Sequence, residues 1–237
     1  SREALTRVFQ TSFSLKGDDE DKKKDDKSKE EKLLWVVDPI DGTTNFQAGL
    51  PLFCVSIGVV DPINKKVLVG VIYNPSLDEL TTAVRGHGCY LNSQPLFPSP
   101  HKQRDQTENT PILLSTALVN IGFPVSTPNT LKASSCAVSI LSTRVRGVRM
   151  IASASQAMAW VAHGKLSGYL SWDLNSWDVA AGIVIVEEAG GAVLDFRGKE
   201  VEGVLLGARD LMVCAPGYIN VGREVLQILG ESGCLEY

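Results

Sequence analysis

The arrangement of apolar segments changes near residue 118, and this change limits the folds open to the chain. Before it, short apolar runs alternate with turn sequences such as DPINKK and RGHG, which predicts antiparallel hairpins. The predicted strands are residues 33–37, 53–60, 67–73, 79–84 and 88–91. Beyond residue 120, strand-like and helix-like segments alternate. The sequence therefore predicts a layered α/β (α+β) fold, antiparallel over residues 1–118 and mixed over residues 119–237.

Further elements follow from local patterns. Residues 2–13 have helical spacing of apolar side chains, residues 16–32 form a charged stretch with nothing to bury, and residues 92–110 are polar and loop-like. Strands are predicted at residues 111–117, 146–152, 165–172, 192–196 and 211–215. Helices are predicted at residues 153–164, 178–191 and 219–230.

Composition narrows the functional classes. The chain has 237 residues, 44% of them hydrophobic, which suffices for one large domain or two small ones. A net charge of −4 argues against a nucleic-acid partner, and no apolar run is long enough to span a membrane. The five cysteines are scattered without a CxxC pair. A disulfide framework or zinc site is therefore not expected, and a reducing compartment, the cytoplasm or an organelle matrix, is favoured. A targeting segment ahead of Ser1 stays open.

The stretch DPIDGTTNF, residues 38–46, follows a predicted buried strand. Because Pro39 cannot donate a backbone hydrogen bond, the strand is expected to stop near Asp38. Asp41 and Gly42 then turn the chain, and Thr43 is a suitable helix N-cap. A turn followed by a capped helix explains these residues without any ligand.

A functional interpretation uses the same residues. Two carboxylates on one rigid turn suit Mg²⁺, which prefers oxygen ligands. The amides of Gly42 and Thr43 at a helix start suit a phosphate group. The combination points to phosphoryl chemistry, but it requires a partner elsewhere in the chain.

The partner is SWDVAAGIVIVEEAGG, residues 176–191. Asp178 lies at the predicted start of the helix, where a negative charge is favoured. Taken alone, it is explained as an ordinary acidic residue of a first turn, with Trp177 in the core and the small residues behind it allowing close packing.

Together the two stretches resemble the inositol monophosphatase family of metal-dependent phosphatases. Residues 38–46 match the form D-P-x-D-G-T-x-N-F throughout, and residues 177–191 match W-D-x-A-A-G-x-x-I-x-x-E-A-G-G at nearly every position. The resemblance implies an αβαβα sandwich of the sugar-phosphatase type, a homodimer and lithium-sensitive hydrolysis of phosphomonoesters. It also places a further helix and hairpin, with an additional metal-binding Thr-Asp pair, before the position of Ser1.

The resemblance implies a role for each matching residue. Asp38, Asp41, Asp178 and the carbonyl of Ile40 would bind two or three Mg²⁺ ions, with Mn²⁺ as an alternative. The Gly42 and Thr43 amides would hold the phosphate, and the Thr43 hydroxyl would orient the attacking water beside Asp41. Metal ions about 3.5–4 Å apart neutralise phosphate oxygens, activate water and stabilise the leaving oxygen, so no covalent intermediate is required.

Three positions differ from the family pattern. At the first position the family has a Glu that ligates metal and helps activate water. In this chain either Asp18, within KGDDE, replaces that Glu, or the stretch contacts nothing. The family loop Gly-Ser/Thr-Ala-Ala is here Ala-Ser-Ala-Ser, residues 152–155, so Ser153 and Ala154 are expected to contact substrate together with Asp178. A family Glu that bonds a sugar hydroxyl is replaced by Ser171, a weaker partner for hydroxyls.

These observations support an Mg²⁺-dependent phosphomonoesterase acting on a small phosphorylated polyol or sugar similar to inositol monophosphate. One alternative is a catalytically weak member of the family that serves as a structural or assembly subunit. Another is a phosphatase for adenosine 3′,5′-bisphosphate or histidinol phosphate. In the enzymatic cases the partner is a small phosphorylated metabolite.

Overall fold

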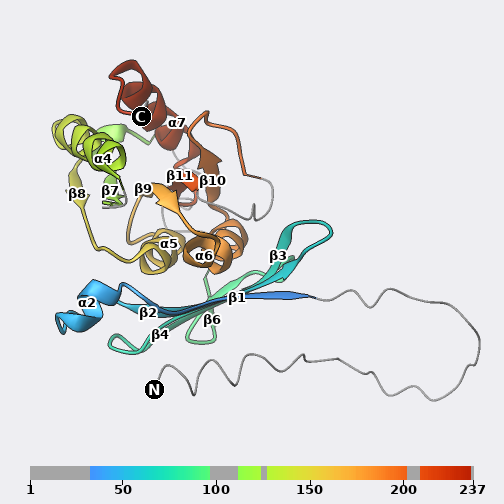
Figure 1. Cartoon of the computed structure of the whole chain (residues 1–237). Helices are drawn as coiled ribbons and strands as arrows, with labels where there is room; N and C mark the ends of the chain where they lie inside the picture. Colours follow the sequence, from blue (N-terminus) through green and yellow to red (C-terminus); the bar gives the residue numbers. More distant parts are fainter. Residues whose placement is uncertain (1–32, 97–111, 124–126, 202–208, 236–237) are drawn as a thin grey trace, which may run out of the picture. The chain divides into compact units, whose positions relative to one another are not determined.

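A computed structural model describes residues 33–96, 112–123, 127–201 and 209–235 (Figure 1). The predicted helix at 2–13 and the charged stretch at 16–32, which contains Asp18, lie outside the described residues.

The first half of the chain forms a six-stranded antiparallel sheet, here called sheet A, in which the strands follow one another in chain order. Its strands are β1 (Leu34–Asp41), β2 (Cys54–Asp61), β3 (Lys66–Asn74), β4 (Glu79–Val84), β5 (Cys89–Leu91) and β6 (Gln94–Pro95). The short helix α2 (Thr43–Gln47) lies between β1 and β2. The predicted hairpins are confirmed, with β2 paired to β3 and β4 to β5.

The second half forms a five-stranded mixed sheet, sheet B, in the order β10-β11-β9-β7-β8. Its strands are β7 (Leu118–Ile121), β8 (Gly147–Arg149), β9 (Gly168–Leu174), β10 (Ala192–Asp195) and β11 (Arg209–Cys214). Strand β7 runs parallel to β8 and β9, whereas β11 is antiparallel to both of its neighbours. The expectation of an antiparallel first half and a mixed second half is therefore confirmed.

Helices α5 (Ala154–Ala162) and α6 (Ser176–Glu188) lie between the two sheets and contact both of them. Helices α4 (Pro128–Leu141) and α7 (Ile219–Glu231) pack on the opposite side of sheet B (Figure 1). This succession of sheet, helices, sheet and helices confirms a layered α+β fold. The middle of helix α6, Val179 to Val186, is apolar and buried throughout, as expected for a helix enclosed by neighbours.

Glycines allow α6 to approach its neighbours closely. A Cβ atom added to Gly58 of β2 would lie 2.8 Å from the Cβ of Ala180, and one added to Gly70 of β3 would lie 2.5 Å from the carbonyl oxygen of Ala181. On the other side, Gly182 faces Met158 of α5, whose sulfur would lie 2.5 Å from an added Cβ. The small residues after Asp178 therefore serve the close packing that the sequence suggested.

One predicted strand is wrong, and one helix was not predicted. Residues 112–117 do not form a strand: Leu114–Thr116 is a 3-10 turn, and the strand begins only at Leu118. The Thr116 hydroxyl donates to the carbonyl of Leu113 at 2.7 Å, an example of a side chain competing with strand pairing. Helix α4 was not predicted, although Thr127 and Thr130 form a capping box and Pro128 occupies its first turn.

The cysteines also differ from expectation. Cys136 of α4 is joined to Cys234, just after α7, by a disulfide. The two cysteines lie far apart in the sequence, and the packing of α4 against α7 brings them together. Their pairing therefore could not be predicted from the sequence. Cys54, Cys89 and Cys214 are free and buried. Within the described ranges, no helix has the length and apolar character needed to cross a membrane.

Candidate active site

Three carboxylates from the two motifs meet between the sheets. Asp38 and Asp41 belong to β1 and Asp178 to the first turn of α6, and each offers an oxygen within 4.8 Å of the others. The sequence predicted this grouping from two stretches more than a hundred residues apart. Carboxylate oxygens gathered in this way are the donor set that Mg²⁺ or Mn²⁺ prefers.

An irregularity in β1 brings Asp38 and Asp41 together. Residues three apart in a regular strand point to opposite faces, because side chains alternate. Here Asp38 pairs with Ser56 and Asp41 with Cys54. An advance of three residues along β1 therefore lies opposite an advance of two residues along β2. This bulge returns both carboxylates to one side.

The end of β1 was therefore predicted wrongly. The strand continues past Asp38 to Asp41, because the irregular pairing accommodates Pro39, which has no donor to contribute. The Ile40 amide donates to the Asp38 carboxylate at 3.0 Å and helps fix its direction.

Gly42, not a threonine, precedes the first turn of α2. Its φ of 83° lies in the left-handed region, and an added Cβ would meet the Leu52 carbonyl oxygen at 2.7 Å, so glycine is required here. The expected capping by Thr43 is wrong, since no side chain caps α2 and Thr43 is its first, exposed residue. Asn45 anchors the helix by donating to the Leu52 and Ile151 carbonyls at 2.7 Å each.

Asp41 is held through one of its oxygens. The Oδ2 atom accepts from the Ser153 hydroxyl at 2.8 Å, the Ser155 amide at 2.6 Å and the Cys54 thiol at 3.8 Å. Ser153, predicted to contact substrate, is 4% exposed and bonds to Asp41 in this structure. Ser155 and Cys54 were missed, because nothing in their local sequence distinguishes them from core residues.

Asp178 begins α6. Its Oδ2 accepts from the Asn175 amide at 2.7 Å in a reciprocal capping box, so the residue also fulfils the ordinary first-turn role that its position predicted. The Ser155 hydroxyl donates to its backbone carbonyl at 3.1 Å. Trp177 is 49% exposed rather than part of the core.

Burial raises the proton affinity of all three carboxyl groups, and neighbouring carboxylates add to the effect at Asp38 and Asp178. Burial, followed by the charge of Asp41 and then that of Asp178, raises the pKa of Asp38 from 3.8 to about 6, against a lowering bond from the Ile40 amide. Burial also raises the pKa of Asp41 and of Asp178. A bound divalent cation would relieve this repulsion, so the residues fit a metal ion.

The remaining predicted residues lie in different surroundings. Ala154 is the half-buried first residue of α5, and Ile40 is half-buried between Asp38 and Asp41. Ser171 of β9 is 2% exposed, and its hydroxyl donates to the Trp172 carbonyl at 3.4 Å. A Cβ on Gly122 would lie 2.0 Å from the Ser171 oxygen, so this hydroxyl sits directly against Gly122.

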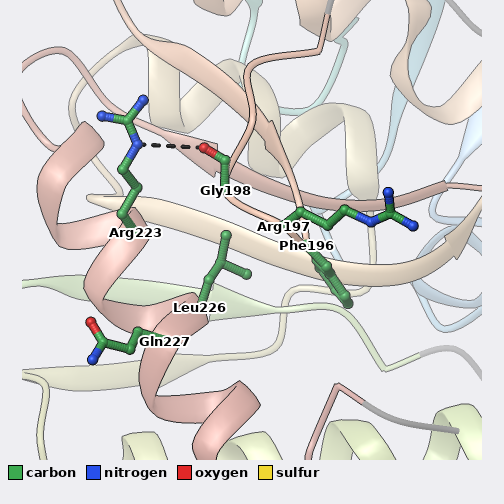
Figure 2. Close-up of a pocket in the computed structure, with 6 residues that line it drawn as sticks. All are labelled: Phe196, Arg197, Gly198, Arg223, Leu226 and Gln227. Atoms are coloured by element: carbon green, nitrogen blue, oxygen red, sulfur yellow. Dashed lines mark hydrogen bonds between the residues drawn. The ribbon is translucent and has the colours of Figure 1, made fainter.

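A separate pocket of about 390 Å³ lies between the turn after β10 and helix α7 (Figure 2). Arg223 donates to the Gly198 carbonyl at 3.4 Å, whereas the Arg197 side chain extends away from Arg223. The pocket contains none of the three carboxylates and no predicted site residue.

Several known proteins have similar sequences. The chain is 41% identical to inositol monophosphatase 1 of Solanum lycopersicum over 71% of its length and 58% of that protein. It is 35% identical to the Nus factor SuhB of Pasteurella multocida over 93% of its length and 72% of that protein. The chain spans 58–66% of the length of the first curated relatives.

Solved structures agree. An IMPase of Thermotoga maritima superposes with a TM-score of 0.70 at 28% identity, covering 97% of this chain and 78% of that one. SaIMPase-II, a staphylococcal IMPase-II solved with inositol monophosphate and with 2′AMP, gives a TM-score of 0.66 at 28% identity. The match to the inositol monophosphate complex covers 84% of this chain and 73% of that one. The inositol monophosphatase family model matches residues 2–227, and the chain belongs to that family.

Proposed function

We propose that this chain is a metal-dependent phosphomonoesterase acting on a small phosphorylated polyol or sugar. The observation that carries the proposal is the convergence of Asp38, Asp41 and Asp178 within 4.8 Å, with pKa values raised by burial. Membership of the inositol monophosphatase family supports it.

In this proposal Asp38, Asp41, Asp178 and the Ile40 carbonyl hold the ions, with two or three Mg²⁺ expected and Mn²⁺ as an alternative. Bound metal would neutralise phosphate oxygens, make a water more acidic and stabilise the leaving oxygen. Asp18 would complete the set, as the family pattern implies.

Other residues of the chain handle the phosphate and the water. The Gly42 and Thr43 amides would hold phosphate oxygens at the turn after β1, and the exposed Thr43 hydroxyl would orient the attacking water. Gly42 suits this role because its lack of a side chain leaves the backbone accessible at a strained turn.

The substrate class rests on likeness rather than on a bound molecule. SaIMPase-II was solved with inositol monophosphate and with 2′AMP, and both are small phosphomonoesters. Adenosine 3′,5′-bisphosphate and histidinol phosphate therefore belong in the same test. Ser171 offers no carboxylate to a substrate hydroxyl and is buried, which favours a substrate that does not depend on such a contact.

Phosphate release measured with malachite green tests the proposal over a panel of inositol, sugar, nucleotide and histidinol phosphates, with Mg²⁺, with EDTA and with added lithium. Release from at least one substrate should require Mg²⁺ and fall at least a hundredfold in Asp178→Asn, following the usual cost of a misplaced catalytic group. Asp61→Asn is the matched control, because the Asp61 carboxylate, at the end of β2, accepts from Ile63 and Asn64 of the following turn and is no predicted site residue. No release from any substrate by active-site-intact protein would refute the proposal.

The second candidate is a structural or assembly subunit, favoured by the likeness to the Nus factor SuhB over 93% of the chain. It predicts a stable complex with a partner protein that survives Asp178→Asn and removal of metal. Titration with Mn²⁺ separates the two candidates, because a purely structural role requires no metal affinity.

A further inference from the structure

Asp41 does more than contribute a carboxylate to the acidic cluster: it also caps a helix that belongs to another part of the chain. The N-terminus of a helix leaves amides without partners, and the N-cap side chain usually accepts from one of them. Ser153 is the N-cap of α5, yet its side chain accepts no such bond. The Ser155 amide instead donates to Asp41 at 2.6 Å.

Ser153 is thereby free to act as a donor. Its hydroxyl donates to the same Oδ2 atom of Asp41 at 2.8 Å, and the Cys54 thiol approaches that atom at 3.8 Å. The Ser153, Ser155 and Cys54 donors all bond to the Oδ2 atom of Asp41, so they fix the carboxylate through that oxygen. A carboxylate fixed through one oxygen presents the other in a defined direction.

The same helix end also contacts the second motif. The Ser155 hydroxyl donates to the Asp178 carbonyl at 3.1 Å, so the first turn of α5 touches both chain segments that supply the acidic cluster. Both serines are buried, which makes these bonds inaccessible to competing water.

We propose that Ser153 is a positioning residue, with Ser155 as its partner: the start of α5 sets the direction of the Asp41 carboxylate and its place relative to Asp178, and so sets metal affinity. This inference rests on the proposed function, in which Asp41 and Asp178 hold metal. It assigns Ser153 to the metal site rather than to substrate contact, the role that the family pattern suggested.

The inference is tested by titrating the full chain with Mn²⁺. Binding is measured by calorimetry and by the electron paramagnetic resonance signal of free Mn²⁺. Loss of an outer partner of a metal ligand commonly weakens affinity 10–100-fold, so Ser153→Ala should raise the Mn²⁺ dissociation constant about tenfold or more. Ser135→Ala, which removes an exposed hydroxyl bonded within α4, should leave the constant unchanged.

Ser155→Ala keeps the amide bond to Asp41 and removes the hydroxyl that bonds to the Asp178 carbonyl, so its effect should be smaller than that of Ser153→Ala. Melting temperatures measured in EDTA establish that each variant is folded. Should Ser153→Ala fail to fold, Ser153→Gly removes the same hydroxyl at an N-cap position, where glycine is tolerated.

The outcomes are distinct. Absence of Mn²⁺ binding by the unaltered chain would overturn the proposed function itself. Binding by the unaltered chain with the same dissociation constant in the folded Ser153 variant would overturn the positioning role alone. A KM for substrate that rises in Ser153→Ala while Mn²⁺ affinity stays unchanged would return Ser153 to substrate contact.

Discussion

Replacing Asp38 with asparagine should make the metal-free protein more stable while it abolishes metal binding. Burial, together with the charges of Asp41 and Asp178, raises the pKa of the half-buried Asp38 to about 6. A carboxyl group whose pKa is raised on folding binds its proton more tightly in the folded state. The free energy of unfolding therefore falls as pH rises from about 4 through 6, and the full cost is present at pH 7.5.

The magnitude follows from the pKa. A rise from 3.8 to about 6 corresponds to roughly 3 kcal/mol, which solvent screening at a half-exposed group reduces to about 1 kcal/mol. Asparagine has similar size and retains an oxygen for the Ile40 amide, whose bond to Asp38 measures 3.0 Å. Asp38→Asn should therefore gain about 1 kcal/mol at pH 7.5 and nothing near pH 4.

Urea unfolding in EDTA at the two pH values measures the difference. Glu224→Gln removes one charge from an exposed position of α7 and serves as the matched control. With Mg²⁺ present at pH 7.5, the melting temperature of the unaltered chain should rise and that of Asp38→Asn should not. A variant that is less stable than the unaltered chain at pH 7.5 without metal would refute the repulsion argument.

Three further outcomes are expected. Gly70→Ala should lower the free energy of unfolding by about 1–3 kcal/mol through overpacking. In the same urea titrations Gly230→Ala in α7, where an added Cβ would lie 3.9 Å from Leu235, should raise it by about 0.5–1 kcal/mol. Cys234→Ser should destabilise the oxidised protein by about 2–4 kcal/mol, because the disulfide with Cys136 closes a long loop; equal melting temperatures with and without a dithiol would contradict this. Burial lowers the pKa of His163 to about 4, so stability should decline as pH falls from 6.5 to 4, and His163→Gln should flatten that slope.

The sequence allowed Asp38, Asp41 and Asp178 to be selected because each belongs to a short motif and the two motifs together resemble those of one family. A strand followed by Asp38, and a helix that begins near Asp178, can be predicted from apolar runs and turn residues alone. The hairpins of sheet A were predictable for the same reason.

Features that depend on tertiary contacts could not be predicted in this way. The bulge that turns Asp41 toward Asp38 arises from pairing with β2, and Ser155 bonds to Asp41 from 114 residues away. Helix α4 was missed because its serines and threonines resemble a loop, although the capping box of Thr127 was a usable signal. The Cys136–Cys234 disulfide likewise depends on the packing of α4 against α7.

The glycines beneath α6 have a consequence for how substitutions in this protein are interpreted. Gly58 and Gly70 carry no carboxylate and lie against α6, yet any side chain there would displace the helix that carries Asp178 away from the strand that carries Asp38 and Asp41. Random mutagenesis scored only by phosphate release would therefore identify these glycines as though they were ligands. Excess metal should restore part of the activity of such displaced variants, because they retain every carboxylate, and it should restore none to a variant that lacks one.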